Sequence, residues 1–309
     1  MAAETATFPT PRAFESRFFY TNDGLKLHMR DYRAAQPNRS LPVVCLPGLA
    51  RTAADFDRLA QALSGMAAQP PRRVVALDYR GRGLSDWDAN PRNYDLKVEN
   101  ADILEVLTAA GIGEAIFIGT SRGGLHLMVL GAVRPSILRG VVLNDIGPVI
   151  EKTGLARIRG YVGKMPRPAS VEEALGMVKR ISAASFPGLS DDDWRTFVHL
   201  TYEEKDGHLV TRYDPALGSA LDAFDLEAPL PDMWPQFEAL RDVPMLAIRG
   251  AHSDLLSAAT LAEMARRHPD CETYIVAGQG HAPLLIDNAS ISRIATFVAE
   301  IDPLPKARQ

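Results

Sequence analysis

Short uninterrupted runs of apolar residues recur along the chain, separated by stretches in which apolar residues follow helical spacing. The runs typical of strands buried on both faces of a sheet cover residues 41–46, 73–78, 115–119, 138–145, 245–250 and 272–276. Between these runs, apolar residues three and four positions apart predict helices, for example over 95–110 and in a closing helix that carries Ile291, Ile294 and Val298. This alternation predicts an α/β fold with a doubly wound, mostly parallel sheet.

Two segments depart from the alternation. Near the start, the turn residues at 22–24 include Asp-Gly and predict an antiparallel hairpin between the stretches on either side. From residue 149 to 225 the sequence contains amphipathic helical pieces and no convincing buried strand. We therefore expect a core made from residues 1–148 and 226–309, with a helical cap, 149–225, inserted over the carboxyl ends of the strands.

Composition and charge narrow the class of protein. With 309 residues, of which 46% are hydrophobic, the chain is large and apolar enough for a sizeable core. The formal net charge is −4 and no basic run is present, so we expect neither nucleic acid nor an anionic membrane as a partner. Residues 1–8 lack the basic and apolar regions of a signal peptide, and we expect a cytoplasmic protein.

The two cysteines fall within predicted strands. Cys45 belongs to the run at 41–46, and Cys271 directly precedes the run at 272–276. Two reduced thiols are the simpler interpretation, although the sequence alone leaves a disulfide open. Neither cysteine belongs to a metal-binding motif, and we expect no metal and no cofactor.

One glycine-rich turn carries the main chemical signal. The apolar run at 115–118 ends in Gly119–Thr120–Ser121–Arg122–Gly123–Gly124, and a helical pattern follows directly. This is G-x-S-x-G between a strand and a helix, the context of a nucleophile held on a tight turn. Side chains at the glycine positions would collide with neighbouring backbone. We identify Ser121 as the candidate nucleophile; an ordinary serine on a glycine-rich connection is the alternative.

A serine hydroxyl becomes a nucleophile when a base takes its proton and a third group orients that base. Among seven histidines, His281 lies on a glycine-rich loop after the last predicted strand, where it can reach the same rim of the sheet as Ser121. Asp254 follows the strand 245–250 and precedes His281, so we choose it as the acid. Asp145, after the strand that follows Ser121, is the second choice.

The developing oxyanion needs backbone N–H donors. Arg122 supplies one because it directly follows the nucleophile, and its N–H lies at a helix N-terminus. The second donor is expected in the loop after the strand 42–46, where we choose Leu49, just after Pro47–Gly48. The Arg122 side chain is left with two options, an ion pair away from the site or contact with substrate.

Four separated motifs together resemble the α/β-hydrolase superfamily, in its serine-hydrolase branch with a helical cap. They are Leu46–Pro47–Gly48, the stretch 78–85 that reads DYRGRGLS, Gly119–Gly124, and Gly250 to Asp254 with Gly280–His281. The resemblance covers nearly the whole chain and implies a mostly parallel sheet of about eight strands with the active site beneath the cap. By the same resemblance, Ser121, Asp254 and His281 match the catalytic triad, and Leu49 and Arg122 match the oxyanion donors. Pro47–Gly48 departs from the His-Gly of many relatives.

The implied activity is hydrolysis of a small carboxylic ester or lactone through an acyl-enzyme on Ser121. A serine at the turn excludes relatives that attack epoxides or haloalkanes with an aspartate. Three alternatives remain: a C–C bond hydrolase of ring-fission diketones, a cofactor-free haloperoxidase or perhydrolase, and a ligand-binding protein with an idle triad. The expected partner is the small-molecule substrate, and a homodimer is left open.

Large apolar side chains of the cap are candidates for the pocket wall, but at helical spacing such residues more often pack a cap against its sheet. These residues, which we leave out of the predicted site, are Tyr161, Met165, Met177, Phe186, Trp194, Phe197, Phe224 and Trp234.

Overall fold

The computed structural model describes residues 14–36, 39–222, 225 and 228–302. Within them, a sheet of eight strands has the order β1-β2-β4-β3-β5-β6-β9-β10. The antiparallel pairs are β1 with β2 and β2 with β4, and all other neighbours are parallel. The strands are β1 (Glu15–Tyr20), β2 (Lys26–Tyr32), β3 (Val43–Leu46), β4 (Val74–Asp78), β5 (Ala115–Thr120), β6 (Leu138–Asn144), β9 (Met245–Gly250) and β10 (Cys271–Val276). The predicted α/β-hydrolase fold is confirmed.

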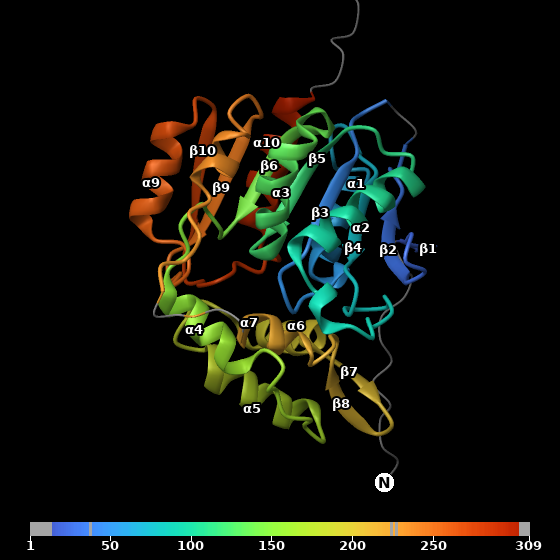
Figure 1. Cartoon of the computed structure of the whole chain (residues 1–309), viewed down its shortest axis with the longest axis vertical. Coiled ribbons are helices and arrows are strands. Elements are labelled where there is room, and N and C mark those ends of the chain that lie inside the picture. The colour runs from blue at the N-terminus through green and yellow to red at the C-terminus, as the bar shows by residue number, and fades with distance from the viewer. Residues whose placement is uncertain (1–13, 37–38, 223–224, 226–227, 303–309) are drawn as a thin grey trace, which may run out of the picture.

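Helices cover both faces of this sheet (Figure 1). One face carries α1 (Asp57–Ser64) and α10 (Asn288–Ile301). The other carries α2 (Leu96–Ala109), α3 (Arg122–Val133), α8 (Trp234–Glu238) and α9 (Ala258–Arg267). In the described part of the chain, short 3-10 turns lie at η1 (Ala53–Phe56), η2 (Pro91–Asn93) and η3 (Pro135–Ile137). Because both faces are covered, the central strands must be apolar on both sides.

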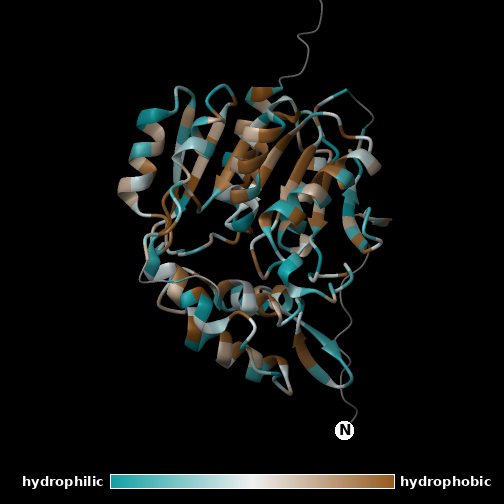
Figure 2. Ribbon diagram, in the orientation of Figure 1, coloured by the Kyte–Doolittle hydropathy of each residue, from teal (hydrophilic) through white to brown (hydrophobic). Residues whose placement is uncertain are grey.

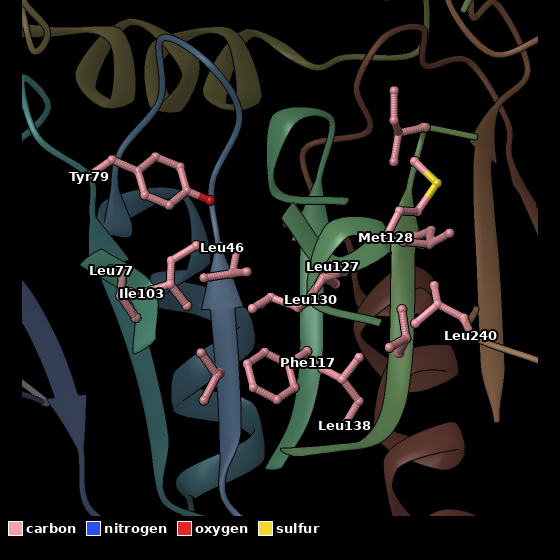
Figure 3. Packing of buried hydrophobic residues seen from close by; sticks show 14 of the residues in the cluster. Leu46, Leu77, Tyr79, Ile103, Phe117, Leu127, Met128, Leu130, Leu138 and Leu240 are labelled. Carbon is pink, nitrogen blue, oxygen red and sulfur yellow. The ribbon is translucent and has the colours of Figure 1, made fainter. Parts of the chain in front are cut away.

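The central strands divide their side chains between the two faces. In β3, Val43 and Cys45 join the cluster under α1 and α10, while Val44 and Leu46 join the cluster under α2 and α3. The central strands are largely brown in the hydropathy colouring of Figure 2, and the close view in Figure 3 shows Leu46 and Phe117 beside α3 side chains such as Leu127. Each fully buried aliphatic side chain of this kind contributes about 1.5–3 kcal/mol to the free energy of unfolding.

Between β6 and β9 the chain builds a separate layer at the carboxyl ends of the parallel strands (Figure 1). The layer contains α4 (Lys152–Tyr161), α5 (Val171–Ser182), α6 (Asp191–Thr201), β7 (Tyr202–Lys205), β8 (His208–Thr211) and α7 (Leu217–Asp222). We call these elements, 152–222, the cap. The cap has a hydrophobic cluster of its own, in which α5 contributes Val178 and α6 contributes Trp194. The division of the chain at residues 148 and 225 stays a prediction.

The cap also contains a hairpin that the hydrophobic pattern does not predict. β7 pairs with β8 in antiparallel register, and the turn residues Asp206 and Gly207 have φ values of 52° and 75°. Left-handed values at both turn positions favour Asp-Gly, which is the sequence signal for this hairpin. The alternation of apolar residues is weak because the strands are short and only partly buried.

Cys45 in β3 and Cys271 in β10 are both free, the first buried and the second half-buried. Among the described residues, no helix combines the length and the apolar character that a membrane crossing requires.

Candidate active site

The turn between β5 and α3 holds Ser121 in a strained backbone conformation, with φ at 50° and ψ at −111°. Such a conformation is sparsely populated for a residue with a side chain and persists only where the surroundings enforce it. The surroundings here are tight, because a Cβ on Gly123 would lie 2.1 Å from the carbonyl oxygen of Leu46 and one on Gly119 would lie 2.5 Å from the carbonyl carbon of Gly123. The glycines therefore allow the turn that exposes the serine.

Replacing Gly123 with alanine is expected to lower the free energy of unfolding by about 2 kcal/mol or more, because the added methyl group meets backbone that cannot move aside. Gly113 is the matched control, since a Cβ there meets nothing within 4 Å. Its replacement by alanine is expected to change stability by less than about 1 kcal/mol. Urea unfolding of both variants measures the difference, and equal midpoints would contradict the packing argument.

Ser121 follows the central strand β5 and His281 follows the edge strand β10, and both residues line the same cavity. The Ser121 Oγ lies 2.9 Å from Nε2 of His281, and Nδ1 of the same ring lies 2.8 Å from Oδ2 of Asp145. An ionised carboxylate can only accept, so Nδ1 carries the ring hydrogen in the neutral imidazole. Nε2 is then the acceptor that faces the serine hydroxyl, which is the arrangement a general base requires.

Asp145 is fully buried at the end of β6 and is held by several donors. Its Oδ1 accepts the N–H of Gly250 at 2.7 Å, and its Oδ2 accepts the hydroxyl of Ser253 at 2.6 Å. The residue has φ of 58°, and its own N–H donates to the carbonyl of Ile248 at 2.8 Å. These bonds fix the carboxylate in a single orientation toward His281.

The choice of Asp254 as the partner of His281 is wrong. Its two carboxylate oxygens accept hydrogen bonds from Nε and Nη2 of Arg157, on α4 of the cap, at 2.6 and 2.8 Å. Partial burial by itself would raise the pKa of Asp254, but the hydrogen bonds and the positive charge of Arg157, with smaller contributions, together lower the pKa. The turn after β9 directs the Ser253 side chain toward Asp145 and leaves Asp254, one residue later, facing the cap. The second choice, Asp145, occupies the position beside the histidine.

The segments that carry the predicted oxyanion donors both lie next to the serine. The loop after β3 passes close to it, since a Cβ on Gly48 would lie 3.8 Å from the Cβ of Ser121. Leu49, the next residue, lines the same cavity as Ser121. Arg122 begins α3, so its N–H has no acceptor within the helix. Donation to an oxyanion from Leu49 and Arg122 stays a prediction.

The side chain of Arg122 forms an ion pair away from the cavity, which is the first of the two options predicted from the sequence. Its Nε donates to Oε2 of Glu99 at 2.6 Å, and its Nη2 donates to the carbonyl of Tyr94 at 3.2 Å. Arg122 is absent from the residues that line the cavity, which places its charge behind the serine.

A cavity between the cap and the strand ends opens onto Ser121 and His281. Most of its wall is apolar, and the polar wall includes the ion pair of Arg51 with Asp55 and the guanidinium of Arg157. The large apolar residues considered from the sequence as pocket wall fall into two groups, those that line the cavity and those that do not. Tyr161, Met165, Phe186 and Phe197 line it, Met177, Trp194 and Trp234 do not, and Phe224 lies outside the described residues.

A second hydrogen-bonded series of serine, histidine and aspartate lies at the edge of the sheet. Ser16 Oγ is 2.6 Å from Nε2 of His28, and Nδ1 of His28 is 2.7 Å from Oδ2 of Asp78. Ser16 lies inside strand β1, not on a turn with positive φ, and it is not among the residues that line the cavity beside Ser121. We assign this chain to the structure of the sheet, because it binds β1 to β2 and β4.

Comparisons with known proteins agree on one family. The model described as "Alpha/beta hydrolase family" matches residues 43–290. The chain is 34% identical over 279 residues to a 3-hydroxybutyrate-oligomer hydrolase of Cupriavidus necator, covering 88% of this chain and 93% of that protein. It is 31% identical over 210 residues to a 2-(acetamidomethylene)succinate hydrolase of Mesorhizobium japonicum, covering 67% and 71%. A crystal structure of an α/β hydrolase from Novosphingobium aromaticivorans is similar with a TM-score of 0.85 and 36% identity, over 94% of this chain and 99% of that one.

Proposed function

This chain belongs to the α/β hydrolase family, and we propose that it is a serine hydrolase that cleaves a carboxylic ester through an acyl-enzyme on Ser121. The observation that carries the proposal is the hydrogen-bond chain from Ser121 through His281 to Asp145, which opens into a mostly apolar cavity beneath the cap. A nucleophile, a base and an orienting acid at these distances are the parts that acyl transfer needs.

In the proposed reaction, Nε2 of His281 takes the proton from Ser121 as Oγ attacks the ester carbonyl. The carbonyl oxygen becomes an oxyanion and accepts hydrogen bonds from the N–H groups of Leu49 and Arg122. The C–O bond to the alcohol then breaks, and His281 returns the proton to the leaving oxygen. Water, deprotonated by the same nitrogen, attacks the acyl-enzyme and releases the acid, which restores Ser121.

Asp145 supports both proton transfers in this scheme without taking a proton itself. Its carboxylate holds Nδ1–H of His281 and stabilises the imidazolium that forms when Nε2 is protonated. The hydrogen bonds from Gly250 and Ser253 keep the carboxylate in place during both halves of the reaction.

The cavity favours a small ester of moderate polarity. The charged side chains at its wall are paired, Arg51 with Asp55 and Arg157 with Asp254, so these two pairs add no net charge to the site. By its name, the relative from Cupriavidus necator acts on 3-hydroxybutyrate oligomers, which are linear esters with polar ends. We propose a linear ester of a short hydroxy acid as the substrate class, with a lactone as the second candidate.

A substrate panel tests the proposal and separates it from the alternatives. The panel contains the linear dimer of 3-hydroxybutyrate, p-nitrophenyl butyrate, a small lactone, a ring-fission diketone, and hydrogen peroxide with a halide acceptor. We expect kcat/KM for the linear esters to exceed that for the diketone by about a hundredfold or more, because the two reactions need different stabilising groups.

Each alternative predicts a different result on this panel. Faster turnover of the diketone would favour C–C bond hydrolysis. A peroxide-dependent reaction faster than ester hydrolysis would favour a haloperoxidase or perhydrolase. No turnover together with no labelling by a fluorophosphonate probe would favour a ligand-binding protein with an idle triad.

A further inference from the structure

A buried carboxylate on α2 lies behind the proposed active site. Glu99 has no exposed surface, and each of its carboxylate oxygens pairs with a different arginine. Oε1 accepts from Nη1 of Arg82 at 2.6 Å, and Oε2 accepts from Nε of Arg122 at 2.6 Å. An ion pair with one oxygen for each partner holds two segments of backbone at a fixed separation.

Each of these arginines is tied to one side of the proposed oxyanion hole. Arg82 is fully buried, and its Nε donates to the carbonyl oxygen of Leu49 at 2.9 Å. That bond fixes the position of the Leu49 residue, whose N–H we expect to be one of the donors. Arg122 is itself the residue that carries the other donor, at the first position of α3.

Glu99 therefore connects, through two guanidinium groups, the loop after β3 and the N-terminus of α3. We propose that Glu99 is a positioning residue for the oxyanion hole, one that sets the spacing between the N–H groups of Leu49 and Arg122. This inference rests on the proposed ester hydrolysis, because it assigns Glu99 a part in that reaction.

The physical basis is the sensitivity of oxyanion stabilisation to geometry. Backbone donors act on the transition state only if they lie about 2.7–3.1 Å from the place where the oxyanion forms, and they cost nothing in reorganisation when they are fixed beforehand. Loss of the Glu99 charge would free both arginines to seek other partners and would let the two segments move independently. Ground-state binding of the ester depends instead on the cavity walls, which Glu99 does not reach.

The cluster has one further member, His126 on α3, whose Nε2 lies 3.1 Å from Oε2 of Glu99. Burial lowers the pKa of His126 to about 4, although the hydrogen bond to Glu99 acts in the opposite direction. The ring is therefore neutral at pH 7, and the carboxylate faces two positive charges. One excess positive charge remains behind the serine.

The test is Glu99→Gln in the full-length protein, with hydrolysis of p-nitrophenyl butyrate as the readout. We expect kcat to fall about 10- to 100-fold while KM changes less than about twofold, since the lost effect belongs to the transition state. The affinity for a trifluoromethyl ketone inhibitor, whose adduct carries an oxyanion, is expected to fall by the same factor as kcat. A role confined to structure would not produce that parallel loss in the folded fraction of the protein.

Asp102→Asn is the matched control on the same helix, almost one turn further along. Asp102 is also buried, and its carboxylate accepts Nε and Nη2 of Arg80 at 2.7 and 2.6 Å. The Arg80 side chain donates to Asp23, Asp88 and Asp102, and neither Leu49 nor Arg122 accepts a hydrogen bond from it. We expect this variant to lose stability in a similar way but to keep kcat within about twofold of wild type.

A second variant covers the case in which Glu99→Gln does not fold. In Glu99→Gln with Arg122→Met, the carboxylate and one guanidinium are removed together, so the buried cluster keeps its single excess positive charge. The same fall in kcat with unchanged KM is expected in this variant. An unchanged kcat in either folded variant, or a fall equal to that of Asp102→Asn, would overturn the inference.

Failure of the positioning role of Glu99 can be distinguished from failure of the proposed ester hydrolysis. Wild-type protein that hydrolyses the ester and loses this activity on Ser121→Ala satisfies the proposed function. In that enzyme, a Glu99 variant with normal kcat overturns only the positioning role. Wild-type protein without ester hydrolysis would overturn both.

Discussion

Ser121→Ala is expected to lower kcat/KM for p-nitrophenyl butyrate by about 10⁴-fold or more, because the variant has no nucleophile for the base to activate. The oxyanion donors and the cavity would remain and would supply only a residual rate. Steady-state kinetics measure the loss. Mass spectrometry after treatment with a fluorophosphonate probe measures whether the covalent adduct forms, and we expect none in the variant.

The chain provides its own control for this experiment. Ser16 has the same residue types behind it, with His28 at 2.6 Å and Asp78 beyond, yet it lies inside a strand away from the cavity. Ser16→Ala is expected to keep the adduct and the activity. Retention of activity in Ser121→Ala, or its loss in Ser16→Ala, would contradict the assignment of the nucleophile.

Asp145→Asn is expected to lower kcat for the same ester by about 10³- to 10⁴-fold. An amide cannot accept from His281, Gly250 and Ser253 as the carboxylate does, and its N–H₂ group favours the histidine tautomer that presents N–H to the serine. Kinetics of the purified variant measure the effect. Thermal melting reports how much of the loss comes from unfolding, because the same carboxylate also accepts the N–H of Gly250 at the end of β9.

Asp254→Asn is the paired variant that separates the two acids. Its carboxylate forms an ion pair with Arg157 and is partly exposed, so we expect kcat to fall less than about tenfold. Most of that effect would come from a change in how the cap packs on the core. A larger loss in Asp254→Asn than in Asp145→Asn would return the catalytic assignment to Asp254.

Much of the fold follows from local patterns in the sequence. Continuous apolar runs such as 115–118 predict strands buried on both faces, and the structure places that run in β5 between β3 and β6. The glycines around Ser121 predict a turn too tight for side chains, and the contacts at Gly119 and Gly123 confirm it. Patterns of this kind work because they report burial and backbone conformation, which depend on near neighbours in the chain.

The acid of the proposed triad illustrates what such patterns leave open. Asp145 and Asp254 both follow parallel strands, β6 and β9, that are neighbours in the sheet. Strand position brings both to the rim of the site, and the direction of each side chain then decides which one meets His281. That direction depends on a backbone φ of 58° at Asp145 and on a cap arginine about a hundred residues before Asp254, and neither is visible in the local sequence.

The buried charge cluster around Glu99 can be predicted in part from the sequence. Glu99 lies four residues before Ile103 and seven before Val106, so it shares the inward face of α2 with them, and all three are buried. A charged residue in a buried stripe predicts a charged partner. The apolar spacing over 95–110 predicts the helix and its buried face, but it does not identify the charged residue within that face.

The pairing of Asp254 with Arg157 has a consequence for exchange of the cap between relatives. Arg157 belongs to α4 and Asp254 to the loop after β9, so the bond joins two parts that a chimaeric protein would take from different parents. A grafted cap without an arginine at this place would leave the Asp254 carboxylate without its counter-charge. The cap can therefore be exchanged as a module only if the incoming cap carries an arginine that pairs with Asp254.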